Sequence, residues 1–395
     1  MGYVGLPLAI AAQKAGWKIF GLDTNHSRVD QLRNGSSYVE DVSNEVLKSA
    51  LSKGFTPSTD FSIISECSIV VICVPTPLSE SGEPDLSFLL KATASVAAFA
   101  NSGTLVINES TSFPRTVRDL IPNEISAVRE DLQLLYAVAP ERVDPANSSW
   151  NYRNTPRLVS GLTAEATELA RNFYASFCDQ VVIVSSPEVA ELSKLIENSF
   201  RQVNIALMNE LVPIAKALNV DIFEVIRSAT SKPYGFMPFY PGVGVGGHCI
   251  PVDPMYLSWA ANKFGFKTSL IDAAQKINNL MPHYVAKLAV TTRTSTANKV
   301  LVVGLSYKPG VADLRESPSV ELIKLLNSEF EYVDFWDGIV ENWNGEIRSK
   351  LIDKYDLVIV TQRVVDEDVL AAISSAERVI DCTGQFTSLP NVETF

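Results

Sequence analysis

The sequence predicts an α/β protein with two doubly wound parallel-sheet domains, joined by a helical central domain that contains a long spine helix. Near both ends of the chain, short runs rich in Val and Ile alternate with helix-length segments, as in parallel sheets with crossover helices. Between them, residues 187–218 carry apolar side chains at helical spacing. We therefore predict an N-terminal domain (1–186), a central helical domain (187–290) and a C-terminal domain (291–395).

Each predicted strand is a short apolar run bounded by turn residues, and each parallel-sheet domain has its own set. In the long helix, Pro187 suits the first turn, whereas Pro213 is expected to kink the helix or end it early. The strand-bearing segments are 17–23, 67–77, 103–111, 132–141 and 181–186 in the first domain, and 299–310, 330–337, 355–361 and 377–384 in the last.

Composition and charge exclude several classes of protein. The chain has 395 residues and a formal net charge of −12, which argues against binding to nucleic acid or to an anionic membrane. The five cysteines are odd in number and show no metal-ligand spacing, so we expect a reduced, cytoplasmic protein without a metal site. We find no signal peptide and no apolar run long enough to span a membrane.

The first residues resemble part of a dinucleotide-binding motif. Gly2 and Gly5 have the spacing of the last two glycines of G-x-G-x-x-G, and Asp23 ends the next predicted strand. Such glycines let a pyrophosphate approach a helix N-terminus, and the acid binds the ribose hydroxyls, which favours NAD over NADP. The alternative is an N-terminal helix with incidental glycines; Asp23 and the α/β pattern argue against it.

The motif lacks its first glycine and the strand before it. In a doubly wound sheet that strand is central, with neighbours on both sides. We therefore expect the first strand of the N-terminal Rossmann-like sheet to be missing and the sequence to be N-terminally truncated. As written, the chain is expected to bind NAD poorly and to have an unstable first domain.

A second motif is the glycine-rich stretch 240–254, "YPGVGVGGHCIPVDP", which contains Cys249. Glycines at this density suit a loop whose backbone approaches a ligand closely. A catalytic thiol needs a nearby base or cation, and Lys194 and Asn198, one helical turn apart, could hold an anionic oxygen. The alternatives are a solvated helix face for that pair and a loop-fixing hydrogen bond for His248. The other cysteines have the character of small core residues.

Seven motifs occur in a consistent order, and together they resemble the UDP-glucose/GDP-mannose (nucleotide-sugar) dehydrogenase family over essentially the entire chain. The segment "FMPFYPG" before "GGHCIP" is similar to the branch that oxidises UDP-N-acetylhexosamines, particularly UDP-N-acetylglucosamine. The motifs are "GYVGLP", "VPTP", "EST", "APERV", "AELSKLIENSFRQVNIALMNE", "GGHCIPVDP" and "GLSYKPGVADLRESP".

The resemblance implies an NAD-dependent oxidoreductase that oxidises the sugar C6 hydroxyl twice, to a carboxylate. Cys249 would form a thiohemiacetal and then a thioester, which water hydrolyses. The implied product is a precursor of surface polysaccharides. The implied catalytic residues are Cys249, Lys194 and Asn198, the latter two stabilising oxyanions, with Asp253, Glu141 and Thr111 handling water and protons.

The resemblance also implies ligand contacts and an assembly. The protein is expected to form a homodimer through the long central helix. Residues expected to bind NAD are Gly2, Tyr3, Val4, Gly5, Asp23, Arg28, Pro75, Thr76, Glu109 and Arg315. Residues expected to bind the UDP-sugar are Arg142, Phe239, Tyr240, Gly242, Gly246 and Lys308.

Departures from the family pattern bear on the substrate and on one loop. Val252 stands where UDP-glucose enzymes commonly carry lysine, which favours an N-acetylhexosamine, and Arg115 stands where glycine is expected. The alternatives are a UDP-glucose 6-dehydrogenase, a truncated inactive nucleotide-sugar binder, and another NAD dehydrogenase that transfers a single hydride and needs no thiol.

Overall fold

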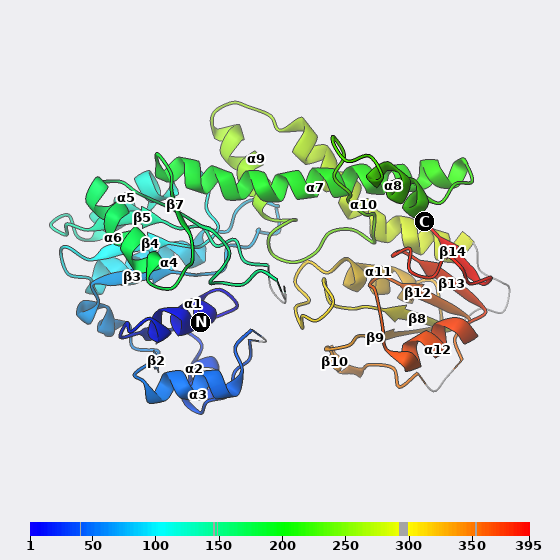
Figure 1. Ribbon diagram of the computed structural model, residues 1–395, viewed down its shortest axis with the longest axis horizontal. Coiled ribbons are helices and arrows are strands. Elements are labelled where there is room, and N and C mark those ends of the chain that lie inside the picture. Colours follow the sequence, from blue (N-terminus) through cyan, green and yellow to red (C-terminus); the bar gives the residue numbers. More distant parts are fainter. Residues whose placement is uncertain (40, 145–146, 148, 292–298, 352–353) are drawn as a thin grey trace. The chain divides into compact units, whose positions relative to one another are not determined.

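The structure is a computed structural model, and it describes residues 1–39, 41–144, 147, 149–291, 299–351 and 354–395. These residues form two compact units. Unit 1 contains Met1–Glu197 and Trp259–Phe264, and unit 2 contains Asn198–Ser258 and Gly265–Phe395. The predicted α/β class with parallel sheets and a long central helix is confirmed (Figure 1). The division into three domains stays a prediction.

The main sheet of unit 1 has five strands in the order β3-β4-β5-β6-β7. Strand β6 was not predicted, and the prediction that all strands are parallel is wrong for it, because β6 runs antiparallel to β5. The strand begins with the charged Arg157, directly after Pro156, and has no long Val/Ile run, so it carries a weak strand signal. The bounds are β3 (Ile69–Ile72), β4 (Leu105–Asn108), β5 (Leu135–Val138), β6 (Arg157–Gly161) and β7 (Val181–Ile183).

Helices cover both faces of this sheet, as a doubly wound fold requires. On β4, Leu105 and Ile107 pack with α6, whereas Val106, on the other face, packs with α4 and α5. This alternation follows from the two-residue period of a strand. The helices are α4 (Ser87–Phe99), α5 (Ile121–Val128) and α6 (Ala164–Ala175), with a 3₁₀ turn at Phe61–Glu66 and a π-helical turn at Thr116–Leu120.

The first 58 residues form a smaller layer around a two-stranded parallel sheet of β1 and β2. Among the described residues, β1 pairs only with β2, and no strand joins β1 to β3. The Met1 side chain lies beside Gly21 of β1. The elements are α1 (Gly5–Lys14), β1 (Phe20–Leu22), α2 (His26–Arg33), α3 (Asn44–Ser52) and β2 (Thr56–Ser58).

Helix α7 (Pro187–Ala217) is the long helix of Figure 1. It continues for four residues after Pro213, so the predicted early end is wrong. Proline removes one backbone hydrogen bond, but Val212 and Ala215 on either side of it are buried against the core of unit 2. Tertiary packing therefore outweighs the local cost. Among the described helices, none is both long enough and apolar enough to cross a membrane.

Unit 2 contains a five-stranded, fully parallel sheet in the order β14-β13-β12-β8-β9. Its core is built on continuous apolar strands, of which Leu357–Val360 is buried at every position. The strands are β8 (Lys299–Val303), β9 (Tyr332–Trp336), β12 (Leu357–Val360), β13 (Arg378–Asp381) and β14 (Val392–Thr394), with a small hairpin of β10 (Asn342–Trp343) and β11 (Glu346–Ile347). The helices are α8 (Ile222–Thr230), α10 (Ser269–Thr291), α11 (Pro318–Asn327) and α12 (Glu367–Ser375), together with the first part of α9 (Asp253–Lys263), whose residues from Trp259 belong to unit 1.

Candidate active site

The glycine-rich loop lies against Tyr307, in the turn that follows β8. A Cβ added at Gly246 would lie 2.7 Å from the Cβ of Tyr307 and 2.9 Å from the carbonyl oxygen of Glu316. At Gly247 the backbone has a φ of +81°, and an added Cβ would meet the Tyr307 ring at 2.8 Å. The Gly247 amide donates to the carbonyl oxygen of Arg315 at 3.0 Å. These glycines therefore let the loop pack directly on the turn at residues 304–318.

Replacing Gly246 with alanine is expected to lower the free energy of unfolding of unit 2 by about 1–3 kcal/mol, because the methyl group overpacks against backbone. Gly242→Ala is the matched control, because its added Cβ would have no neighbour closer than 3.9 Å. That control should change stability by less than about 0.5 kcal/mol. Urea denaturation of both variants measures the difference, and equal effects would contradict the packing argument.

A backbone hydrogen bond closes one helical turn between Cys249 and Asp253. The Asp253 amide, at the start of α9, donates to the carbonyl oxygen of Cys249 at 2.9 Å. Asp253 is fully buried, and its Oδ2 accepts a hydrogen bond from Asn198 Nδ2 at 2.7 Å. Cys249 is half-buried. The structure thus brings together three of the predicted catalytic residues within unit 2.

Gly242, one of the predicted substrate residues of unit 2, is held by a polar ladder between α7 and α10. Asn209 Oδ1 accepts from the Gly242 amide at 2.9 Å, and its Nδ2 donates to Asn278 Oδ1 at 2.9 Å. Phe239 packs edge-on against Phe200, with ring centroids 5.6 Å apart. Tyr240 is exposed and Lys308 is half-buried. The ladder fixes the start of the glycine loop through a backbone atom.

Unit 1 carries the other predicted catalytic residues in buried positions. Thr111, Glu141 and Lys194 are all nearly inaccessible to solvent. Burial raises the pKa of Glu141, while Lys194 and Arg157 lower it. Lys194 therefore interacts favourably with the ionised form of Glu141. The neighbouring Arg142, which is predicted to bind the substrate, forms an ion pair at 2.6 Å with Glu197 of α7.

The residues of the N-terminal glycine motif fit a pyrophosphate. Helix α1 begins at Gly5, and a Cβ added at Gly2 would meet no atom within 4 Å, so the backbone there is open to a ligand. Tyr3 and Val4 lie between these glycines. Asp23 follows β1 directly and accepts from the Asn25 amide at 2.8 Å. Its other oxygen lies 2.6 Å from the Met1 amino group, which lowers its pKa.

The other residues predicted to bind NAD differ in their exposure to solvent. Arg28 and Pro75 are exposed and Thr76 is buried. Arg315 belongs to unit 2, where it pairs with Asp313 at 2.6 Å. For these residues, contact with NAD stays a prediction.

Glu109 lies in a buried cluster that the sequence analysis did not find. Its Oε1 accepts from the hydroxyl groups of Tyr152 at 2.8 Å and Tyr174 at 2.5 Å. The fully buried Arg157 approaches Oε2 at 3.7 Å and lies over both tyrosine rings. Glu109 therefore holds together β4, β6 and α6, and its contact with NAD stays a prediction. The lone arginine of a short strand is the only sequence signal for this cluster.

The chain belongs to the UDP-glucose/GDP-mannose dehydrogenase family. Its residues 1–178 match the family's NAD binding domain, residues 188–280 its central domain and residues 301–384 its UDP binding domain. The protein is therefore an NAD-dependent oxidoreductase that acts on a UDP-sugar. When bound, NAD supplies the acceptor for a hydride.

Relatives with known names support this assignment. The chain is 34% identical over 350 residues to the UDP-N-acetyl-D-glucosamine 6-dehydrogenase of Salmonella typhi, covering 86% of this chain and 81% of the relative. It is 33% identical over 370 residues to the UDP-N-acetyl-D-mannosamine dehydrogenase of Pyrococcus horikoshii, covering 91% and 87%. A solved structure of a UDP-D-ManNAc dehydrogenase from Pyrococcus horikoshii superimposes with a TM-score of 0.89 at 29% identity, covering 100% of this chain and 97% of that one.

Proposed function

We propose that this protein oxidises the C6 hydroxyl of a UDP-N-acetylhexosamine, with UDP-N-acetylglucosamine the first candidate, to the uronate in two NAD-dependent steps. The observation that carries the proposal is the half-buried Cys249 at the end of a packed glycine loop, one turn before the buried Asp253. A single oxidation of an alcohol needs no thiol, whereas oxidation of an aldehyde to an acid can use one. The names of the relatives and Val252 support the choice of sugar.

Cys249 provides covalent chemistry between the two oxidations. Its thiol adds to the C6 aldehyde to give a thiohemiacetal, which has a C–H bond that can lose hydride. Loss of that hydride gives a thioester, and water cleaves the C–S bond to release the carboxylate and the thiol. The four electrons removed from the sugar reduce two NAD molecules, so each sugar should yield two NADH.

The polar residues stabilise charge and direct water in this scheme. Asn198 and Lys194 donate to the oxyanions that form at C6, and Asp253 and Glu141 orient the water that cleaves the thioester. Thr111 assists proton movement. The hydrogen bond between Asn198 and Asp253 supports this division, because it fixes a donor and an acceptor beside the turn that contains Cys249.

A side-by-side assay tests the proposal. UDP-N-acetylglucosamine, UDP-N-acetylgalactosamine, UDP-N-acetylmannosamine and UDP-glucose are compared by kcat/KM and by the yield of NADH per sugar. We expect preference for an N-acetylhexosamine and two NADH per sugar. A preference of about tenfold or more for UDP-glucose would refute the proposed substrate. One NADH per sugar would refute the thioester route, and binding without NADH formation would favour an inactive nucleotide-sugar binder.

A homodimer through α7 is part of the proposal. Large apolar side chains on this helix are exposed at intervals of four and seven residues, which return to one helix face. Soluble monomers rarely expose such a continuous apolar stripe. We call these residues the α7 stripe: Val189, Ile196, Phe200, Leu207 and Ile214 on the helix, and Leu218 directly after its last residue.

Replacing Leu207 of the α7 stripe with glutamate is expected to convert the dimer into a monomer, because a charge would be buried at the interface without a partner. Sedimentation equilibrium should show a fall from twice the chain mass of 43.2 kDa to the chain mass. Arg201→Glu is the control, because this exposed residue lies about 120° around the helix from Leu207. A wild-type protein that sediments as a monomer would contradict the dimer.

We also propose a cytoplasmic location and a role in making precursors of surface polysaccharides. All five cysteines are free in the structure, which suits a reducing compartment. Non-reducing mass analysis of protein purified without reductant should find five alkylatable thiols. A disulfide in the native protein would argue against that compartment.

A further inference from the structure

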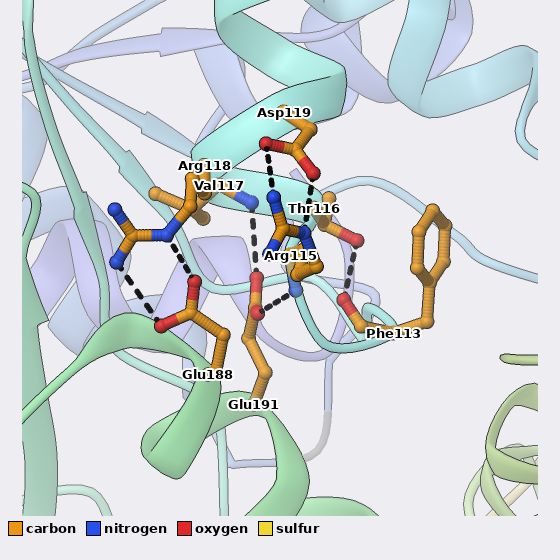
Figure 2. A network of polar contacts seen from close by, with 8 residues as sticks. All are labelled: Phe113, Arg115, Thr116, Val117, Arg118, Asp119, Glu188 and Glu191. Carbon is orange, nitrogen blue, oxygen red and sulfur yellow. Dashed lines mark hydrogen bonds and ion pairs between the residues drawn. The ribbon is translucent and has the colours of Figure 1, made fainter. Parts of the chain in front are cut away.

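A buried carboxyl that the proposed mechanism does not use joins α7 to the loop after Thr111. Glu191 is almost completely buried. Its Oε2 accepts from the Arg115 amide at 2.8 Å, and its Oε1 accepts from the Val117 amide at 3.0 Å (Figure 2). The loop is tight, since the Thr116 hydroxyl and amide both contact the carbonyl oxygen of Phe113, at 2.6 and 3.1 Å. One side chain therefore holds both sides of a sharp turn.

The two arginines close to Glu191 form ion pairs with other carboxylates. Figure 2 shows the Arg115 guanidinium paired with Asp119 and the Arg118 guanidinium paired with Glu188. Burial raises the pKa of Glu191 to about 8, although the two amides and the Ser112 hydroxyl lower it. Placing a carboxyl here thus costs free energy, and within the described part of the chain no ion pair with Glu191 offsets it, because the nearby guanidinium groups pair with Asp119 and Glu188. In its ionised form, which the two amide donors favour, the carboxyl offers two acceptor oxygens side by side, one for each amide.

The turn also needs this support because of Arg115. This residue has a φ of +81°, in the left-handed region, where residues with a side chain are strained. The two amides that Glu191 binds belong to Arg115 itself and to the residue two positions later. The carboxyl therefore holds the strained residue in place from both sides.

We propose that Glu191 is a positioning residue that fixes Thr111 relative to Lys194 for the reaction. Glu191 precedes Lys194 by three residues, so both project from neighbouring turns of one side of α7. The loop that it binds starts directly after the buried Thr111. Loss of either amide contact would free the loop, and with it Thr111, without touching a ligand. This inference rests on the proposed function, which gives Thr111 and Lys194 their roles.

The variant Glu191→Gln tests the proposal, because an amide has only one acceptor oxygen and its NH₂ group would face a backbone N–H. We expect at least a tenfold fall in kcat with less than a twofold change in the KM of the UDP-sugar. Glu188→Gln is the matched control: it lies on the same helix but pairs with a side chain, Arg118, near the surface. We expect the control to keep wild-type kcat. Equal kcat values for both variants and the wild type would overturn the proposal.

Hydrogen exchange gives a readout that needs no substrate. The amides of Arg115 and Val117 should be protected in the wild-type protein and should exchange at least fivefold faster in Glu191→Gln. Rapid exchange of both amides in the wild type would overturn the proposal even if the variant fails to fold. Because this measurement is independent of turnover, a protected loop in a protein that oxidises no UDP-sugar would refute the proposed function and leave the contact intact.

Discussion

Cys249→Ser is expected to abolish formation of the uronate while leaving UDP-sugar binding within about twofold of the wild type. A hydroxyl is far less nucleophilic than a thiol near neutral pH, and an ester is a poorer acyl donor than a thioester, so the overall rate should fall by at least about a thousandfold. The first oxidation does not use the thiol. Rapid-quench analysis should therefore find the sugar at the aldehyde or hemiacetal stage.

Cys67→Ser provides the control for this experiment. Cys67 is also partly exposed, but it lies in unit 1 after a 3₁₀ turn, where its thiol contacts the carbonyl oxygen of Ile63 at 3.5 Å. This variant should retain the wild-type rate. Unchanged turnover in Cys249→Ser would mean that the thiol is structural and would remove the main support for the thioester route.

Lys194→Met is expected to reduce kcat by at least about a hundredfold and to destabilise unit 1 in a pH-dependent way. The pKa of Glu141 is raised from its ordinary value of 4.5 by burial, and Lys194 opposes that rise. Without Lys194, the folded-state pKa of Glu141 should rise further. A carboxyl with a raised folded-state pKa contributes stability that is present below its unfolded pKa and is lost as pH rises through the folded pKa.

As pH falls, more of Glu141 becomes neutral and gains less from Lys194, whereas at higher pH its ionised form depends on that cation. The variant should therefore lose more stability at pH 8 than at pH 5, as measured by urea denaturation at both values. Adding Glu141→Gln to Lys194→Met should restore much of the loss at pH 8, because no buried charge then lacks its partner. Additive effects of the two substitutions would contradict a direct coupling.

The sequence is a good guide to elements whose signal is local. The strands β8, β9, β12 and β13 were predictable because each is a short run containing β-branched or aromatic residues, and α7 because its apolar residues recur at helical spacing. The cysteine loop was equally clear, since its glycine density has few structural explanations. The short strands β2 and β6 lacked such a pattern, and the antiparallel direction of β6 depends on which strand it pairs with.

By itself, the sequence determined the α/β class, the long helix, the thiol at Cys249 and the family motifs, because each depends on residue type and spacing over a few turns. Only the tertiary structure decided which buried acid meets which donor. Glu109 binds two tyrosines 43 and 65 residues away, and Glu191 binds amides 74 and 76 residues away. A glutamate has the same hydrogen-bonding capacity wherever it stands, so its partner depends on how distant segments pack and not on its neighbours in sequence.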